Sequence, residues 1–259
     1  MMGNIEKSIL KKADLFDQSI SRYIMRAMLA CFYLTLGTGI AVGLAQFIEQ
    51  LAPGWGKIGY SFMFTWSLVM IIYLNAELGT SNMMYMTTAV HRKILPWKKA
   101  LMILLTCILF NAIGAVLISS LLSYTGVFHN MAADHFLLTT VAAKLKKAPM
   151  QIFVEGIFAN MVVNIAFFVS MRMKDDAGKV LAIVFLIFIF AFLGFEHVIA
   201  NFSSFSLAYF ASGGHVPGMT FSAVATNILF ATLGNFVGGG LIMGLNYSWL
   251  NNEKINYRD

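Results

Sequence analysis

The sequence contains few charged residues and few cysteines, and both shortages limit what the protein can be. Only 12% of its 259 residues are Asp, Glu, Lys or Arg, whereas 59% are hydrophobic and the mean hydropathy is +0.75. This composition excludes an ordinary soluble globular domain and predicts an integral membrane protein. Cys31 and Cys107 lie in apolar runs and are too few for a disulfide framework or a thiolate metal site, so we interpret both as packing residues.

Several sequence signals of other functions are also missing. The chain has no Gly-rich phosphate loop, no HExxH zinc signature and no GxSxG nucleophile motif, so we expect no enzyme activity, no metal and no cofactor. The net charge is +6, but the basic residues are spread between apolar stretches, and nucleic acid is therefore not an expected partner. Charges throughout residues 1–26 leave no apolar core for a cleavable signal peptide.

Long apolar stretches dominate the rest of the chain. A helix that crosses the roughly 30 Å hydrocarbon core of a bilayer needs about 20 apolar residues. The candidate spans are 27–48, 58–90, 100–122, 150–171, 180–210 and 219–249. We therefore expect a single all-α six-span domain over 27–250, followed by a tail at 251–259.

The loop charges predict how the spans are oriented. Lys and Arg number 14 in residues 1–26, 91–99, 172–179 and 251–259, against 4 in the alternate loops. The positive-inside bias then places both termini in the cytoplasm of a multi-pass protein, which we assign to a prokaryotic plasma membrane. Residues 1–26 are expected to form an amphipathic helix on the inner membrane surface, or a helix packed on a neighbouring subunit.

The second and fifth spans carry polar interruptions in matching places. Residues 75–82 (NAELGTSN) and 194–201 (GFEHVIAN) each place a Glu five residues before an Asn. In each half the following span carries an Asn three residues before a Gly, at Asn111 and Asn235. This ordered repeat predicts two halves of three spans each, inverted relative to one another because the number of spans per half is odd.

Matching breaks in two inverted halves predict a binding site near the membrane midplane, because unwound backbone survives there only beside protein or water. Capping residues end each break, so a half-helix is expected to begin there, with free N–H groups that favour an anion. Close packing of helices through small polar residues is the alternative. The residues expected to shape the two breaks are Glu77, Gly79, Ser81, Asn82, Glu196 and Asn201.

Ionisable groups inside spans are candidates for function because their burial is costly. Glu77 and Glu196 are expected to cap free N–H groups of the opposite break, whereas Glu155 has no partner that the sequence identifies. The imidazole of His197 can donate a hydrogen bond to an anion or pass a proton, and Asn160 is a candidate partner for it.

Three lysines, Lys144, Lys146 and Lys147, precede the fourth span on the side that should be external. They are either harmless charges in a long loop or an electropositive mouth that concentrates anions.

These motifs, together with the run from Lys144 to Pro149, FANMVVN (158–164) and TLGNFVGGG (232–240), make the chain resemble the formate/nitrite transporter family over nearly its whole length. The resemblance implies a homopentamer of aquaporin-like pores in membrane lipid that conduct formate, nitrite, hydrosulfide or short carboxylates. It implies that His197 is the central pore histidine, that Thr80 contacts it, that Asn160 lines the site and that Lys144 is the vestibule lysine.

The resemblance also assigns the hydrophobic constrictions beside the histidine to Phe64, Leu68, Leu78 and Phe190. Gly79 stands where formate channels of the family carry a bulky Phe, so a wider or more mobile inner constriction is expected. An isolated charge in a medium of low dielectric costs tens of kcal/mol, whereas protonating a carboxylate at neutral pH costs about 4 kcal/mol. We therefore expect formate to cross with a proton or as the neutral acid. Nitrite or hydrosulfide transport is the alternative, and a neutral-solute channel a further one.

Overall fold

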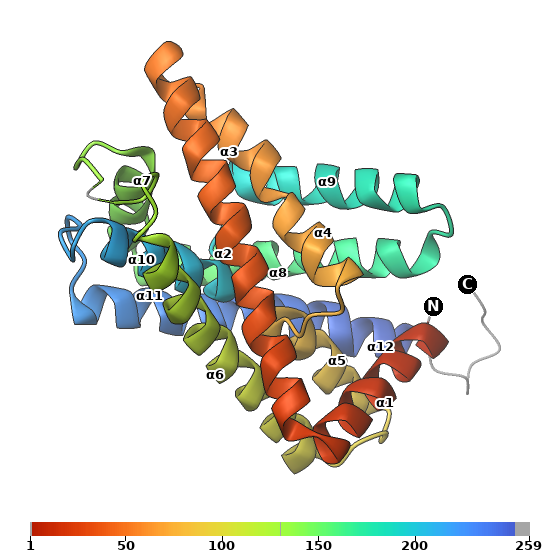
Figure 1. Cartoon of the computed structure of the whole chain (residues 1–259). Coiled ribbons are helices and arrows are strands. Elements are labelled where there is room, and N and C mark those ends of the chain that lie inside the picture. Colours follow the sequence, from red (N-terminus) through yellow and green to blue (C-terminus); the bar gives the residue numbers. More distant parts are fainter. Residues whose placement is uncertain (1, 130, 252–259) are drawn as a thin grey trace.

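The computed structural model describes residues 2–129 and 131–251, and all regular structure in these residues is helical (Figure 1). Of the predicted tail at 251–259, all but Asn251 lies outside the described residues. The elements are α1 (Met2–Gln18), α2 (Ile20–Leu51), α3 (Gly56–Phe64), α4 (Trp66–Tyr73), α5 (Gly79–His91), α6 (Trp97–Leu122), α7 (Phe136–Leu145), α8 (Pro149–Arg172), α9 (Asp176–Leu193), α10 (Val198–Ala211), α11 (Phe221–Asn235), the π-helix η1 (Phe236–Leu245) and α12 (Asn246–Leu250).

Five helical segments are long and apolar enough to cross a membrane: α2, α6, α8, α9 and the continuous segment from α11 to α12. The remaining predicted span is divided into α3, α4 and α5, and the fifth span is divided into α9 and α10. The expected all-helical membrane class and the broken second and fifth helices are therefore confirmed.

The two halves make matching contacts. In the first half α2 packs against α3 and α6, and in the second half α8 packs against α9 and α11. Each short half-helix then packs against the third span of the other half, α10 against α6 and α5 against η1. In Figure 1, α10 lies at the end of the molecule that carries α7, and α5 lies at the end that carries α1. The half-helices thus approach the centre from opposite ends, as inverted repeats require.

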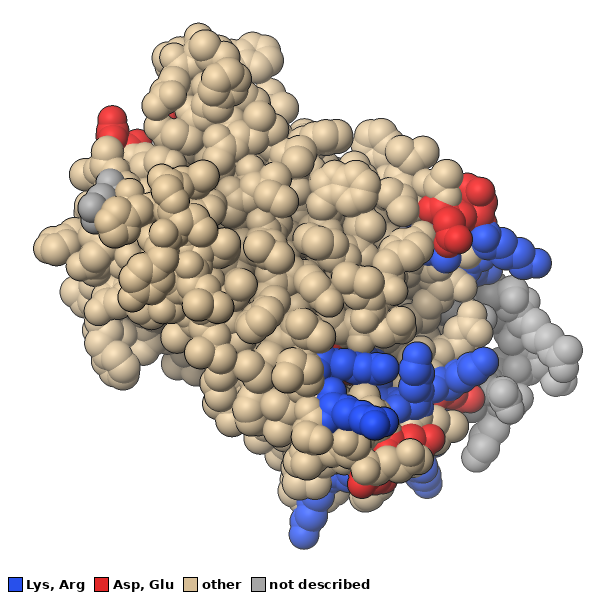
Figure 2. All heavy atoms as spheres, in the orientation of Figure 1, with Lys and Arg blue, Asp and Glu red and all other residues tan. Residues whose placement is uncertain are grey.

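Charge is distributed unevenly over the surface. Figure 2 shows Lys and Arg gathered where α1 lies, whereas a broad part of the visible surface is uncharged. Exposed apolar side chains such as Phe185 and Leu105 cover the long helices, as expected for surfaces that face lipid or another subunit.

The N-terminal segment is divided differently from expectation. Helix α1 ends at Gln18, and residues 20–26 belong to α2, so the N-terminal helix is shorter than the expected 1–26. Its apolar face, with Ile5, Ile9 and Phe16, is buried against the rest of the same chain. The helix therefore packs on its own membrane domain, where it lies against α5.

Candidate functional site

The two breaks have the same backbone design. Helix α4 ends at Tyr73 and α5 begins at Gly79, while α9 ends at Leu193 and α10 begins at Val198. A left-handed residue follows each first segment, Asn75 with φ 53° and Gly194 with φ 72°. Each turns the chain away from the helix two residues before the Glu of its motif.

Asn111, on α6, holds the first break in place. Its Oδ1 accepts a hydrogen bond from the Gly79 N–H at 2.8 Å, at the start of α5. Its Nδ2 donates to the carbonyl of Glu77 at 2.9 Å and to that of Ala27 on α2 at 2.6 Å. One buried amide therefore pairs with an N–H group and a carbonyl group of the first break and also binds the first span.

Asn235, at the end of α11, does the same for the second break. Its Oδ1 accepts from the Val198 N–H at 2.8 Å, and its Nδ2 donates to the carbonyls of Glu196 at 2.9 Å and Gly156 at 2.8 Å. The first N–H group of each half-helix is thus already paired with an amide. The expectation that Glu77 and Glu196 cap the opposite break was wrong, because Asn111 and Asn235 take those N–H groups.

The two glutamates instead form ion pairs beside their own breaks. Glu77 Oε2 accepts from Lys12 Nζ of α1 at 2.6 Å and from Asn82 Nδ2 at 3.0 Å, and its side chain is only 5% exposed. The sequence did not single out Lys12. A buried carboxylate needs a cationic partner, and residues 1–26 contain five basic residues that could provide it. This requirement was the signal by which the sequence could have identified the partner.

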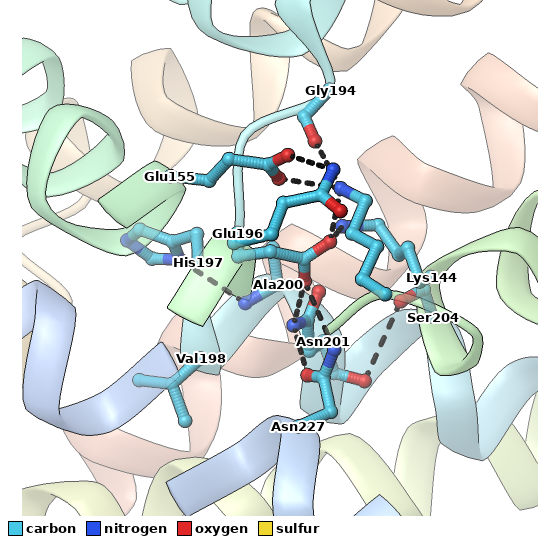
Figure 3. Close-up of polar contacts among 12 residues, drawn as sticks. Lys144, Glu155, Gly194, Glu196, His197, Val198, Ala200, Asn201, Ser204 and Asn227 are labelled. Atoms are coloured by element: carbon cyan, nitrogen blue, oxygen red, sulfur yellow. Dashed lines mark hydrogen bonds and ion pairs between the residues drawn. The ribbon is translucent and has the colours of Figure 1, made fainter. Parts of the chain in front are cut away.

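Glu196 is fully buried and has more partners (Figure 3). Its Oε1 accepts from Lys147 Nζ at 2.6 Å and from Lys144 Nζ at 3.0 Å, and its Oε2 accepts from Asn201 at 2.7 Å and Asn227 at 3.3 Å. The pairs Glu77–Asn82 and Glu196–Asn201 therefore repeat not only in sequence but also in contact.

His197 caps the N-terminus of α10 and meets Thr80 of α5. Its Nδ1 accepts from the Ala200 N–H at 3.2 Å, and its Nε2 lies 2.7 Å from Thr80 Oγ1. Because Nδ1 accepts, the proton of a neutral imidazole is on Nε2, which donates to the Thr80 hydroxyl. The Thr80 hydroxyl keeps its own hydrogen for another acceptor.

A small chamber of about 20 Å³ lies beside His197. Its wall includes all four residues of the expected constrictions, Phe64, Leu68, Leu78 and Phe190. The rings of Phe190 and His197 meet edge to face with centroids 5.7 Å apart, and those of Phe64 and Phe190 are 6.1 Å apart. The chamber has room for about one water molecule, and the rest of its wall is almost entirely apolar.

Gly79 is not part of the chamber wall. A Cβ at this position would lie 2.8 Å from Ile108 Cγ1, 3.1 Å from Asn111 Oδ1 and 3.2 Å from Ile199 Cδ1. Packing between α5, α6 and α10 therefore explains the glycine, and the expected wider inner constriction does not follow from it.

Asn160 and Ser81 support the break rather than the imidazole. Asn160 Nδ2 donates to the carbonyls of Thr80 at 3.0 Å and Asn235 at 2.8 Å, and among the described residues it makes no hydrogen bond to His197. Ser81 Oγ donates to the Leu78 carbonyl at 2.9 Å. Asn160 thus connects the two halves and positions the residue that meets the imidazole.

A charged vestibule lies on each side of the chamber. The one beside α7, which we call the outer vestibule, has a volume of about 410 Å³ and is lined by Lys57, Lys144, Lys147 and Glu155 among others. The one beside α1, the inner vestibule, has a volume of about 180 Å³, and its wall includes Lys11, Lys12, Arg26 and Glu77. Of the three lysines before the fourth span, only Lys146 is exposed and outside the vestibule.

Lys144 and Lys147 lie between spans, and their surroundings shift their pKa values in opposite directions. Burial lowers the pKa of Lys144 below its ordinary value, although Glu196 raises it. Burial also lowers the pKa of Lys147, but the carboxylates of Glu196 and Glu155 raise it by more, and its pKa lies above the ordinary value. Lys144 is therefore the ammonium that gives up a proton more readily.

Apolar spans, two half-helices that meet at a polar centre and a charged vestibule on either side define a membrane channel or transporter. The chain belongs to the formate/nitrite transporter family, whose model, described as "Formate/nitrite transporter", matches residues 1–249. Members of this family are transporters and channels, not enzymes.

Individual relatives agree with this assignment. The chain is 29% identical over 253 residues to the uncharacterized transporter YwcJ of Bacillus subtilis, a match that covers 98% of each chain. It is 31% identical over 191 residues to the nitrite transporter NirC of Escherichia coli, over 73% of this chain and 69% of the relative. A solved FNT family ion channel superimposes with a TM-score of 0.89 at 25% identity, over 96% and 98% of the two chains. A pentameric formate channel with formate bound shares the fold, with a TM-score of 0.76 at 20% identity over 90% and 97%.

The hydrogen bonds of Asn235 allow a test of how the second break is stabilised. Asn235→Ala removes three buried hydrogen bonds and leaves the Val198 N–H without a partner, which costs about 3 kcal/mol. We expect the midpoint of thermal unfolding in detergent to fall by about 5 °C or more. Asn251→Ala, which removes one exposed hydrogen bond, is the control. An equal effect of both substitutions would contradict the role given to Asn235.

The Lys12–Glu77 pair predicts a second effect on stability. Lys12→Met leaves a buried carboxylate without its cation, and breaking a buried pair in this way costs about 3 to 5 kcal/mol. The control is Lys99→Met, which removes an ion pair to Asp17. The Asp17 side chain is 54% exposed, and such a surface pair contributes about 1 kcal/mol or less. Thermal unfolding should show a larger loss for Lys12→Met, and adding Glu77→Gln should restore part of it. If the two single variants unfold alike, the pair at Glu77 is not stabilising.

Proposed function

We propose that the protein conducts small monovalent anions across the membrane, most simply formate, which passes the chamber together with a proton or as the neutral acid. The single observation that carries the proposal is the position of His197. Its imidazole is the titratable group in the wall of a small, mostly apolar chamber, with cationic vestibules on both sides. Such an arrangement attracts anions but leaves room for only about one water molecule at the centre.

The energetics favour neutralisation before passage. The chamber of about 20 Å³ requires an anion to lose its hydration shell. Burying an isolated ion in such surroundings costs far more than the roughly 4 kcal/mol needed to protonate a carboxylate at neutral pH. Nitrite and hydrosulfide are also anions of weak acids and can follow the same route. A strong-acid anion cannot be neutralised and should be excluded.

Lys144 can supply the proton, because it lies in the outer vestibule, where burial lowers its pKa. A neutral His197 that donates its Nε2 hydrogen to Thr80 can give the solute a hydrogen bond through the Thr80 hydroxyl, but it can supply a proton only after it has itself been protonated. We infer that Lys144 and the vestibule attract the anion, and that the His197–Thr80 pair receives it in the chamber.

The names of relatives support this substrate class. NirC is named a nitrite transporter and another solved neighbour a formate channel, so formate and nitrite are the first substrates to compare. That formate channel is described as pentameric, which supports a homopentamer for this chain. The excess of basic residues in alternate loops supports a plasma-membrane protein with both termini in the cytoplasm. A neutral-solute channel is the second candidate, favoured only by the apolar chamber wall.

A substrate panel in proteoliposomes tests the proposal. Fluxes of formate, nitrite, hydrosulfide and glycerol should be measured at two pH values about two units apart. Formate flux should rise at the lower pH, because the neutral fraction of a weak acid increases about tenfold for each unit. His197→Phe should abolish this flux while the protein still folds and assembles. Saturable formate flux that persists in His197→Phe would remove the histidine from the mechanism, and pH-independent glycerol flux would favour a neutral-solute channel.

Lys144→Ala tests the attraction of the anion separately. Because the vestibule would lose one positive charge, uptake should fall several-fold at low formate concentration and much less near saturation. Lys146→Ala is the matched control, since this lysine is exposed and does not line the vestibule. A loss of the same proportion at all concentrations would argue against an attracting role.

A further inference from the structure

Glu155 is a partly buried acid in the outer vestibule to which the proposed function gives no role. It projects from α8, and its side chain is 19% exposed. Its Oε2 accepts from Lys147 Nζ at 2.5 Å, and its Oε1 accepts from Gln151 Nε2 at 2.7 Å. The sequence alone gave Glu155 no partner, and the structure places its carboxylate beside a lysine of the expected anion pathway (Figure 3).

The ammonium group of Lys147 is fully occupied. It has three N–H donors and three acceptors: Glu155 Oε2 at 2.5 Å, Glu196 Oε1 at 2.6 Å and the Gly194 carbonyl at 3.0 Å. Glu196 is completely buried, and the Gly194 carbonyl belongs to the break. The Glu155 carboxylate is therefore the acceptor that a solute in the vestibule can replace.

Lys144 differs from Lys147 in this respect. Among the described residues its Nζ has a single acceptor, Glu196 Oε1 at 3.0 Å. An anion that reaches the vestibule can bind Lys144 without displacing a side chain, but it can bind Lys147 only by displacing Glu155. An anion can therefore bind Lys144 more easily than Lys147, although both lysines line the same vestibule.

The charges in the vestibule lead to the same conclusion. Lys57, Lys144, Lys147 and Glu155 line the vestibule, and Lys144 and Lys147 also pair with the buried Glu196. Glu196 is held by four donors inside the protein, so Glu155 is the negative charge that an incoming anion meets. It weakens the attraction of the vestibule by one unit charge at short range.

We propose that Glu155 lowers the affinity of the outer vestibule for the transported anion, because its carboxylate competes with the anion for Lys147. Exchange of one carboxylate for another keeps Lys147 neutralised in both states. The anion is therefore bound weakly enough to move on to the chamber. This inference rests on the proposed function, because it requires a transported anion.

Initial uptake of radiolabelled formate tests the proposal, in cells that express the protein and lack formate channels of their own. Glu155→Gln removes the charge but keeps the size and an oxygen for Gln151. Its apparent KM for formate should fall about fivefold, as expected for loss of one unit charge a few ångströms from the bound anion in a partly solvated site. The maximum rate should change by less than about twofold, because Glu155 is outside the chamber wall.

Two further variants separate charge from packing and from surface potential. Glu155→Asp retains the carboxylate, and Asp134→Asn removes an exposed negative charge that does not line the vestibule. Both should keep the apparent KM of the unmodified protein. An unchanged or higher KM in Glu155→Gln would show that Glu155 only positions Lys147 and would overturn the proposal, as would an equal fall in Asp134→Asn. If the unmodified protein takes up formate and only the KM prediction fails, the proposed function stands. If it takes up none of formate, nitrite and hydrosulfide, both are overturned.

Discussion

The structure depends on how two unwound segments of backbone are satisfied inside a membrane. Where a helix stops in hydrocarbon, its free N–H and carbonyl groups cost several kcal/mol each unless protein pairs them. Asn111 and Asn235 meet this need with the same three hydrogen bonds each, one accepted from the start of a half-helix and two donated to carbonyls. Each amide therefore stabilises the unwound segment from which one half-helix begins.

The glutamates of the breaks show how the same motif serves both ends of the molecule. Glu77 is paired with Lys12 from the N-terminal helix, and Glu196 is paired with Lys144 and Lys147 from the connection before α8. The cations come from segments outside the repeated spans, so each end of the pathway is completed by a different part of the chain. The burial of both carboxylates is tolerable because each has an ammonium group and an Asn amide.

Charge and the size of the passage act one after the other along the proposed pathway. The vestibules are charged and roomy, whereas the chamber is small and almost entirely apolar. A solute drawn in by charge therefore meets a region where charge is disfavoured. The polar residues in its wall are Ser67 and His197, whose Nε2 lies 2.7 Å from the Thr80 hydroxyl. Glu155 fits this scheme, since a vestibule that bound anions too tightly would hold them back from the chamber.

The sequence by itself determined the membrane class, the spans, the two breaks and the internal repeat, because apolar length and polar interruptions are local properties of the chain. It identified the chamber wall only through family resemblance. The tertiary structure decided the partners: Lys12 for Glu77, Lys147 for Glu155, and asparagines rather than glutamates as caps. It also explained Gly79 by close packing and not by a wider passage. Lys147 and Glu155 are eight residues apart, but the other contacts join residues more than 30 apart in the chain. Those contacts depend on how the helices pack, which neither residue spacing nor composition reveals.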